Sequence, residues 1–479
     1  MKIKEKWSLP NLKEAARRTR SAVERVDQFY IPANALDLGE GKTYAISTYG
    51  CQANERDSET IAGILETIGF RPADDLEHVD LIIINTCAIR QNAEEKVLGE
   101  IGNFKRLYRN NKNLVIGVCG CMAQEDAFVH LVLEKYPQVR LLFGTHNIQD
   151  LPVMLYDVMV NHEKVVQVYS KEGEVYENLP VKRFGQHKAW VNIMYGCDKF
   201  CTYCIVPYTR GKQRSRTMDE ILKEVQELKD AGYKEVTLLG QNVNAYGKDL
   251  DEGIDFATLL EETAKIGIPR IRFMTSHPWD FTNEMVDVIA QYDNIMPFIH
   301  LPVQSGDDEI LRRMGRRYSA ESYLKLYQKI MDTIPNAAVS TDIIVGFPNE
   351  SDEAFEHTLE LVRQCRFDNA FTFIYSPRPG TPAARMEDDI DMDTKRERLY
   401  RLNEEWNRHA LKKNKAYVGK TVTVLVDGAS KNNQNVFAGH TDTNKLVNFT
   451  GTNVRAGDFV EVLITDAKTF SLDGKAVEL

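Results

Sequence analysis

Three closely spaced cysteines constrain the fold of this chain more than any other feature. Cys197, Cys201 and Cys204 follow the spacing C-x3-C-x2-C. Thiolates at this spacing can hold three corners of a [4Fe–4S] cube from one tight loop, which leaves the fourth iron without a protein ligand. The alternatives are buried structural thiols or a zinc site, but zinc sites usually add a fourth cysteine or histidine nearby. No such residue is close in the sequence, which therefore predicts a cluster loop whose open iron can bind a small molecule.

Length, cysteine content and charge fit an intracellular enzyme of several domains. The 479 residues suggest two or three domains, and eight cysteines favour metal or redox chemistry over disulfides. No apolar run is long enough for a signal peptide or a membrane span, so we expect a cytoplasmic protein. Because the net charge is −10, a nucleic acid would have to meet local basic patches, although charge runs are usually solvated faces. The candidate patches are Arg210, Lys212, Arg214 and Arg216; Arg312, Arg313, Arg316 and Arg317; and Lys412, Lys413 and Lys415.

From residue 188 onward, short apolar strands alternate with amphipathic helical stretches. This alternation predicts right-handed parallel βαβ units, and six of them make an open, partial (β/α) barrel. The predicted strands are 189–194, 235–239, 270–274, 297–301, 338–345 and 370–375. A charged helix over 394–417 follows the last of them.

Polar residues or glycines follow the predicted barrel strands, at the ends where such barrels carry out chemistry. The cysteine loop follows the first strand. Each of the other residues alone could be a satisfied structural polar group, so the prediction depends on all the strand ends agreeing. The residues expected to line a cofactor cavity are Gln241, Asn242, Gln304, Ser305, Asp342 and Gly346, with Ser276, His277, His300 and Tyr375 nearby.

A second set of cysteines lies in a predicted N-terminal α/β domain over residues 42–161. Strands are expected at 43–48, 81–85 and 114–118, and Cys51, Cys87 and Cys121 follow them. The carboxyl ends of parallel strands meet at one edge of a sheet, so three thiols would gather there and could hold a second cube. Buried cysteines are also common core residues, which is the interpretation we prefer for Cys119 and Cys365.

The two ends of the chain differ from the rest. Residues 1–41 form no evident domain, although 12–26 could be one basic helix. Residues 416–479 lack helical periodicity and predict about five short strands, broken at Gly428, Asp442, Gly451, Ala467 and Asp473-Gly474. This pattern is typical of a small antiparallel β-barrel that binds RNA, or of a packing or dimerisation module. Lys431, Lys445 and Arg455 are its loop cations.

From residue 42 to residue 479 the chain resembles the radical S-adenosylmethionine methylthiotransferases. Besides Cys197, Cys201 and Cys204, the matching motifs are Tyr49-Gly50-Cys51-Gln52, Asn54-Glu55, Asp57-Ser58-Glu59, Asn85-Thr86-Cys87-Ala88-Ile89-Arg90, Gly120-Cys121-Met122-Ala123-Gln124, and His300 to Gln304-Ser305-Gly306. The resemblance is to the branch that acts on N6-isopentenyladenosine in tRNA. Departures from the family pattern are Ala53, the extra Cys119, and His440 at a commonly basic position.

The resemblance implies four segments: an extension (1–41), an N-terminal domain with an auxiliary cluster (42–161), a radical domain (183–415) and a TRAM-like RNA-binding domain (416–479). It implies two [4Fe–4S] clusters and S-adenosylmethionine. The cluster on Cys197, Cys201 and Cys204 would generate a 5′-deoxyadenosyl radical, and the cluster on Cys51, Cys87 and Cys121 would hold the sulfur to be inserted.

The implied partners are a tRNA anticodon stem-loop and an electron donor of the flavodoxin or ferredoxin type, with the protein a monomer. Alternative substrates within the family are threonylcarbamoyl-adenosine tRNA and a ribosomal protein aspartate. An iron–sulfur sensor that binds RNA without catalysis is the alternative from another functional class.

Overall fold

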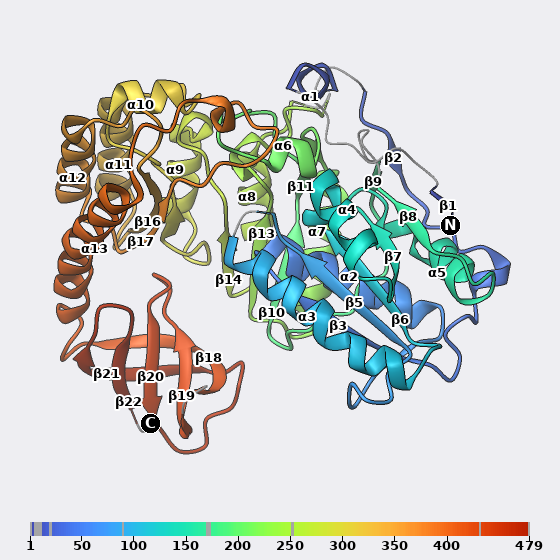
Figure 1. Ribbon diagram of the computed structural model, residues 1–479. Helices are drawn as coiled ribbons and strands as arrows, with labels where there is room; N and C mark the ends of the chain where they lie inside the picture. Colours follow the sequence, from blue (N-terminus) through green and yellow to red (C-terminus); the bar gives the residue numbers. More distant parts are fainter. Residues whose placement is uncertain are drawn as a thin grey trace. The chain divides into compact units, whose positions relative to one another are not determined.

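The computed structural model describes residues 2–3, 12–18, 22–88, 91–168, 174–250, 253–430 and 433–477 (Figure 1). Ile89, Arg90 and Lys431, named above, lie outside these ranges. The chain divides into two compact units. The first comprises residues 1–184, 192–200 and 204–220, and the second comprises 185–191, 201–203 and 221–479. Within the described ranges, the helices are too short or too polar to cross a membrane.

The first unit is built on a parallel sheet of seven strands in the order β1-β8-β7-β6-β5-β3-β4. Its strands are β1 (Lys2–Ile3), β3 (Thr43–Thr48), β4 (Arg71–Pro72), β5 (Leu81–Thr86), β6 (Val115–Gly120), β7 (Val139–Phe143) and β8 (Val165–Gln167). Small pairs flank it: β2 (Arg25–Val26) with β9 (Val175–Tyr176), and β11 (Met194–Tyr195) with β12 (Arg214–Ser215).

Helices cover both faces of this sheet, which is why β5 and β6 read as continuous apolar runs. On one face, α3 (Gln91–Asn110) and α4 (Asp126–Lys135) pack on Ile82, Ile84 and Val118. On the other, α2 (Gln52–Thr67) and α5 (Leu151–Met159) pack on Leu81, Ile83 and Val115 (Figure 1). Short helices η1 (Ala33–Ala35), η2 (Met122–Gln124), η3 (Ile148–Asp150) and α6 (Val206–Thr209) complete the unit.

The three strands predicted for the N-terminal domain are present, within one or two residues of their expected ends. Cys119 lies inside β6 and belongs to the core under α2 and α5, which confirms its prediction as a core residue. The predicted helix over 12–26 is wrong. Helix α1 spans only Leu12–Arg18, and Arg25–Val26 instead pairs in parallel with β9, because backbone pairing there takes priority over helical periodicity.

The second unit contains the predicted barrel strands in two sheets of three, β10-β13-β14 and β15-β16-β17. Their bounds are β10 (Lys188–Asn192), β13 (Glu235–Leu239), β14 (Arg270–Phe273), β15 (Phe298–His300), β16 (Ala338–Val345) and β17 (Asn369–Ile374). The helices are α7 (Met218–Asp230), α8 (Phe256–Ile266), α9 (Asn283–Gln291), α10 (Asp308–Arg313), α11 (Ala320–Thr333), α12 (Asp352–Cys365) and α13 (Met392–Lys415), with η4 (Val243–Ala245), η5 (Pro278–Asp280) and η6 (Ala383–Arg385).

Two details of the barrel differ from the sequence prediction. The first strand is broken at Ile193, whose carbonyl accepts from the Arg216 amide as the chain turns into β11. The six strands also do not form one continuous sheet. β15 is only three residues long, and beyond β14 the backbone pairing is a single β-bridge between Ile271 and Ile295. Pro297 and Pro302 flank β15 and have no amide hydrogen to donate, which limits its pairing.

The C-terminal residues form a closed barrel in the order β18-β19-β20-β22-β21. The strands are β18 (Thr421–Ser430), β19 (Asn433–His440), β20 (Leu446–Thr450), β21 (Phe459–Ala467) and β22 (Leu472–Ala476). Five strands were predicted, but the breaks at Gly428 and Asp473-Gly474 are wrong because these residues lie inside β18 and β22. Gly428 instead sits at a bulge with φ 138°, and the β20–β22 pair is parallel rather than antiparallel.

Candidate functional site

Cys51, Cys87 and Cys121 gather at one edge of the first sheet. They follow β3, β5 and β6, which are neighbours in the parallel sheet, so their carboxyl ends meet. Cys51 is also the residue that precedes the first turn of α2. A Cβ placed on Gly50 would lie only 3.1 Å from Cys87 Sγ, which shows how closely the turn after β3 approaches the second cysteine.

Two buried asparagines hold these turns together. Asn54 Nδ2 donates to Asn85 Oδ1 (3.1 Å) and to the Thr86 carbonyl (2.8 Å), while Asn85 Nδ2 donates to the Asn54 carbonyl (2.9 Å). The Cys121 amide donates to the same Thr86 carbonyl at 2.9 Å. Gly120 has φ 92°, and a Cβ there would lie 2.4 Å from Asn85 Oδ1, so only glycine fits. The sequence motif contained these residues, but their scaffolding role was not predicted.

Two groups at this edge, the Arg210 guanidinium and the N-terminus of α2, would offset the negative charge of thiolates. Burial raises the pKa of Cys121 to about 12, while the nearby Arg210 guanidinium acts in the opposite direction. The N-terminus of α2 adds positive potential beside Cys51. Across the described residues, no three His, Cys, Asp or Glu side chains converge tightly enough for a single metal ion.

Arg210 forms a buried ion pair with Asp57 of α2, with 2.7 Å between its Nη2 and Asp57 Oδ2. Arg216 is likewise buried and pairs with Glu177 at 2.8 Å. The prediction that this basic stretch could contact RNA is therefore wrong, because its cations pack inside the first unit. The four side chains, none more than 7% exposed, are Arg210, Lys212, Arg214 and Arg216.

Replacing Arg210 with alanine should destabilise the first unit by about 3–5 kcal/mol, because Asp57 would remain as a buried charge without its partner. The matched control is Arg106→Ala, which removes an exposed pair with Glu77 and should cost about 1 kcal/mol or less. Urea unfolding of both variants and the wild type measures the difference. If the two variants lose the same free energy of unfolding, the buried Asp57 carboxylate does not need Arg210 as its partner.

The loop that carries Cys197, Cys201 and Cys204 is fixed by backbone contacts on either side. Gly196 has φ 71°, and a Cβ there would lie 2.0 Å from the Lys212 carbonyl oxygen, so glycine is required before Cys197. The Cys197 amide donates to the Gly211 carbonyl at 3.2 Å. Beyond Cys201, the Thr202 amide donates to the Met314 carbonyl at 2.9 Å. All eight cysteines are thiols rather than disulfides.

Polar atoms without a protein partner lie just beyond the carboxyl ends of several barrel strands. Asn242 donates from Nδ2 to Asp280 Oδ2 at 2.6 Å, but its Oδ1 is buried and accepts no hydrogen bond. Ser276 Oγ and Tyr375 Oη are also buried without a partner. Buried polar groups are normally satisfied, so these atoms fit a site completed by a polar cofactor.

The other predicted cavity residues lie close to their expected places. Gln241 is half-buried directly after β13. Gln304 adopts φ 70°, donates its amide to the Asp342 carbonyl (2.8 Å) and accepts from the Ile344 amide (2.9 Å). The Asp342 carboxylate lies on β16, with 3.5 Å between its Oδ1 and His300 Nε2.

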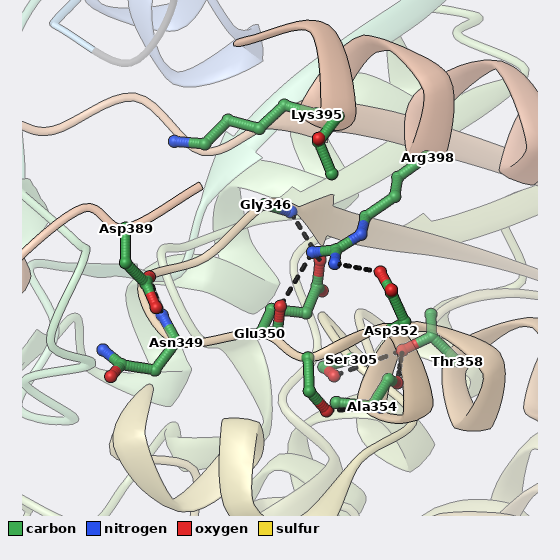
Figure 2. Close-up of polar contacts among 12 residues, drawn as sticks. Ser305, Gly346, Asn349, Glu350, Asp352, Ala354, Thr358, Asp389, Lys395 and Arg398 are labelled. Carbon is green, nitrogen blue, oxygen red and sulfur yellow. Dashed lines mark hydrogen bonds and ion pairs between the residues drawn. The ribbon is translucent and has the colours of Figure 1, made fainter. Parts of the chain in front are cut away.

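Ser305 and Gly346 each take part in buried polar contacts, which Figure 2 shows. The Gly346 amide donates to Glu350 Oε2 at 2.7 Å, and Arg398 Nη1 donates to the same oxygen at 2.9 Å. Ser305 Oγ lies 3.3 Å from the Thr358 hydroxyl. A Cβ on Gly346 would lie 2.4 Å from Lys395 Cγ, so this glycine lets α13 approach β16. Both residues therefore shape the strand ends through structural contacts. Glu350 was not predicted as part of the site. Its position four residues after Gly346 is the only signal that the sequence offers for it.

Comparison with known proteins gives near full-length matches. The chain is 55% identical over 470 residues to the tRNA-2-methylthio-N(6)-dimethylallyladenosine synthase of Bacillus mycoides, covering 98% of this chain and 92% of the relative. The synthase of the same name from Bacillus cytotoxicus is 56% identical with the same coverage, and that of Anoxybacillus flavithermus is 55% identical, covering 98% and 89%. The chain belongs to the tRNA-2-methylthio-N(6)-dimethylallyladenosine synthase family.

Three family models divide the synthase chain. Residues 43–144 match the uncharacterized protein family UPF0004, residues 191–362 the radical SAM superfamily, and residues 415–477 the TRAM domain. A solved radical S-adenosylmethionine methyltransferase, TsrM from Kitasatospora setae, superposes with a TM-score of 0.52 at 12% identity, covering 72% of this chain and 74% of that one. This likeness confirms the predicted fold class. Family membership makes the protein an enzyme that uses S-adenosylmethionine and a [4Fe–4S] cluster.

The TRAM barrel contacts the radical SAM sheets through β18 and through the turn between β19 and β20. Arg270 donates to the Thr423 and His440 carbonyls (3.1 and 2.8 Å), and Arg272 donates to the carbonyls of residues 441 and 442. Lys445 is buried, with 3.0 Å between its Nζ and Asp368 Oδ1. The expectation that Lys445 is a loop cation for RNA is therefore wrong, because it joins the TRAM barrel to the start of β17.

His440 also faces this contact rather than RNA. Its Nδ1 lies 2.7 Å from Asp427 Oδ2, and Lys188 Nζ lies 2.5 Å from Asp427 Oδ1. Burial acts to raise the pKa of Asp427, but the His440 hydrogen bond and the Lys188 charge outweigh it and lower the pKa to about 2. The carboxylate therefore stays charged at neutral pH and fixes the barrel on β10.

Proposed function

We propose that this protein attaches a methylthio group to C2 of N6-dimethylallyladenosine beside the anticodon of tRNA. The observation that carries the proposal is the near full-length identity with synthases of that name, in a chain that keeps both cysteine triads at strand ends. The C2–H bond of adenine is neither acidic nor electrophilic, so acid–base groups cannot replace it. A radical enzyme is the kind of catalyst that this substitution needs.

In this proposal the two clusters have different roles in the reaction. Cys197, Cys201 and Cys204 would hold the radical cluster, and Cys51, Cys87 and Cys121 the auxiliary cluster that carries the sulfur. When bound, a reduced cluster and S-adenosylmethionine supply the radical that removes hydrogen from the substrate. The residues of this chain that would surround S-adenosylmethionine are Gln241, Asn242, Gln304 and Asp342, and Ser305 and Gly346 would support the strand ends beside them. Asn242 Oδ1 offers a buried acceptor for this purpose.

The proposed partner is the anticodon stem-loop of tRNA. Its unpaired loop lowers the cost of moving the target base out of its stack. We also propose an electron donor of the flavodoxin or ferredoxin type, a monomeric protein and a cytoplasmic location, where tRNA is found.

The domain boundaries proposed from the sequence remain 42–161, 183–415 and 416–479, after the extension 1–41.

Mass spectrometry of nucleosides from cells that lack this protein tests the proposal. We expect loss of 2-methylthio-N6-dimethylallyladenosine and accumulation of its precursor without sulfur. Loss of the 2-methylthio derivative of threonylcarbamoyl-adenosine, or of a modified ribosomal protein aspartate, would instead assign the alternative substrates. An unchanged set of modifications would favour a sensor without catalysis.

Replacing Arg455 and Lys475 of the TRAM domain with alanine should weaken tRNA binding and flatten its salt dependence. Both side chains are exposed, and the loop after β20 lies against the end of β22, since a Cβ on Gly451 would lie 2.8 Å from Ala476 Cβ. Two lost phosphate contacts should reduce the slope of log affinity against log salt by roughly one to two units. Lys105→Ala, an exposed lysine on α3, is the control. An unchanged slope would remove these two cations from the RNA surface.

A further inference from the structure

Two phenylalanines are exposed on one face of β17. Phe371 is 43% exposed and Phe373 is 42% exposed. The intervening Thr372 donates from Oγ1 to Asn403 Oδ1 of α13 at 2.7 Å, so its side chain faces the helices. Successive strand residues point to opposite faces, so the two rings lie on the side away from α13, called the inner face here. Two large apolar rings side by side on an uncovered face indicate a binding surface rather than core.

The inner face around this pair is polar beside Phe371, while the apolar Ile344 pairs with Phe373. The His300 ring lies 5.9 Å from the Phe371 ring between centroids, and His300 Nδ1 lies 2.8 Å from Ser340 Oγ. Asp342 is directly opposite Phe371 in the register of β16 and β17, and its carboxylate approaches His300 Nε2 at 3.5 Å. The inner face of this sheet therefore offers an apolar patch bordered by a carboxylate. Such barrels carry out their chemistry at the carboxyl ends of the strands, and Phe373 is the last residue but one of β17.

We propose that Phe371 and Phe373 receive the N6-dimethylallyl group of the substrate adenosine, and that Asp342 excludes anionic N6 substituents. The inference rests on the proposed function. The dimethylallyl group is a branched, uncharged hydrocarbon whose burial against two aromatic rings is favourable, by about 0.8 kcal/mol per methylene removed from water. A threonylcarbamoyl substituent carries a carboxylate instead, and a like charge opposite Asp342 disfavours it. The same strand pair thus attracts one substituent and repels the other.

The test uses anaerobically reconstituted enzyme and three anticodon stem-loop RNAs that differ in one nucleoside. This nucleoside is adenosine, N6-dimethylallyladenosine or threonylcarbamoyl-adenosine. In the wild type, the dimethylallyl RNA should bind about tenfold more tightly than the unmodified RNA. The double substitution Phe371→Ala with Phe373→Ala should reduce this preference to about twofold, with little change in binding of the unmodified RNA.

Further variants separate lost contacts from lost folding. Phe184→Ala removes another exposed phenylalanine, which is 56% exposed, and should leave the preference intact. Phe371→Leu with Phe373→Leu keeps an apolar surface and should restore most of it. Asp342→Asn should strengthen binding of the threonylcarbamoyl RNA about threefold by removing the like charge.

A double alanine variant that keeps the tenfold preference would overturn the inference. Equal weakening of all three RNAs would also overturn it, because the rings would then stack on the base rather than hold its substituent. A wild type that prefers and methylthiolates the threonylcarbamoyl RNA would instead overturn the proposed function, so the two failures are distinguishable.

Discussion

Protein in which Cys197, Cys201 and Cys204 are all replaced by alanine should form no 5′-deoxyadenosine above the background without enzyme. The three thiols follow β10 and β11 on a loop whose backbone is fixed through Gly196 and Thr202, and we propose them as the ligands of a cluster with an open iron. Without them, S-adenosylmethionine cannot receive the electron that cleaves it. Chromatography of the reaction, quenched after incubation with reductant and dimethylallylated tRNA, measures the nucleoside directly.

Iron content provides the control for this prediction. Wild-type protein should hold about eight irons per chain after anaerobic reconstitution, and the triple variant about four. Cys119→Ala and Cys365→Ala should keep about eight, because these two thiols lie within β6 and α12 rather than in a turn after a strand. If Cys119→Ala loses a cluster while Cys121→Ala keeps both, the ligand assignment in the first unit is wrong.

The positions of the cysteines were predictable because their signals are local. β5 and β6 are buried on both faces, so each reads as an apolar run that ends next to a cysteine. Parallel strands place their carboxyl ends at one edge, and this rule alone brings residues 51, 87 and 121 together. It also distinguishes Cys121, beyond the strand end, from Cys119, which is paired with Asn85 inside the sheet.

The contacts around these cysteines were not predictable because they join distant segments. Arg210 pairs with Asp57 across 153 residues of sequence, and nothing local shows that a basic stretch is buried rather than solvated. Lys445 was misassigned for the same reason, since its partner Asp368 lies before β17. The exposed pair Phe371 and Phe373 reads as an ordinary apolar strand in the sequence. Only the contact of Thr372 with α13 reveals that the pair faces away from the helices.

Replacing Cys51, Cys87 and Cys121 with alanine should leave S-adenosylmethionine cleavage intact but abolish the 2-methylthio product. These thiols lie at the edge of the first sheet, in turns that are held by the hydrogen bonds of Asn54, Asn85 and the Thr86 carbonyl. Their loss should therefore remove about four irons while the scaffold remains. The reaction needs both a bound sulfur source and a radical, and this variant lacks only the sulfur source. Both products are measured in one quenched reaction.

The pair of triple variants separates the two roles because each serves as the control for the other. Methylthio product from the protein without the N-terminal triad would refute the assignment of sulfur to that site. Loss of 5′-deoxyadenosine in the same protein would mean that the triad also supports the radical step.

A structural explanation for such a loss is available in the chain itself: Cys121 belongs to the same buried core as Ile205 and Tyr208, which follow Cys204. Conservative Cys→Ser replacements preserve side-chain volume there. If these variants cleave S-adenosylmethionine while the alanine variants do not, the loss reflects packing and the division of roles still holds.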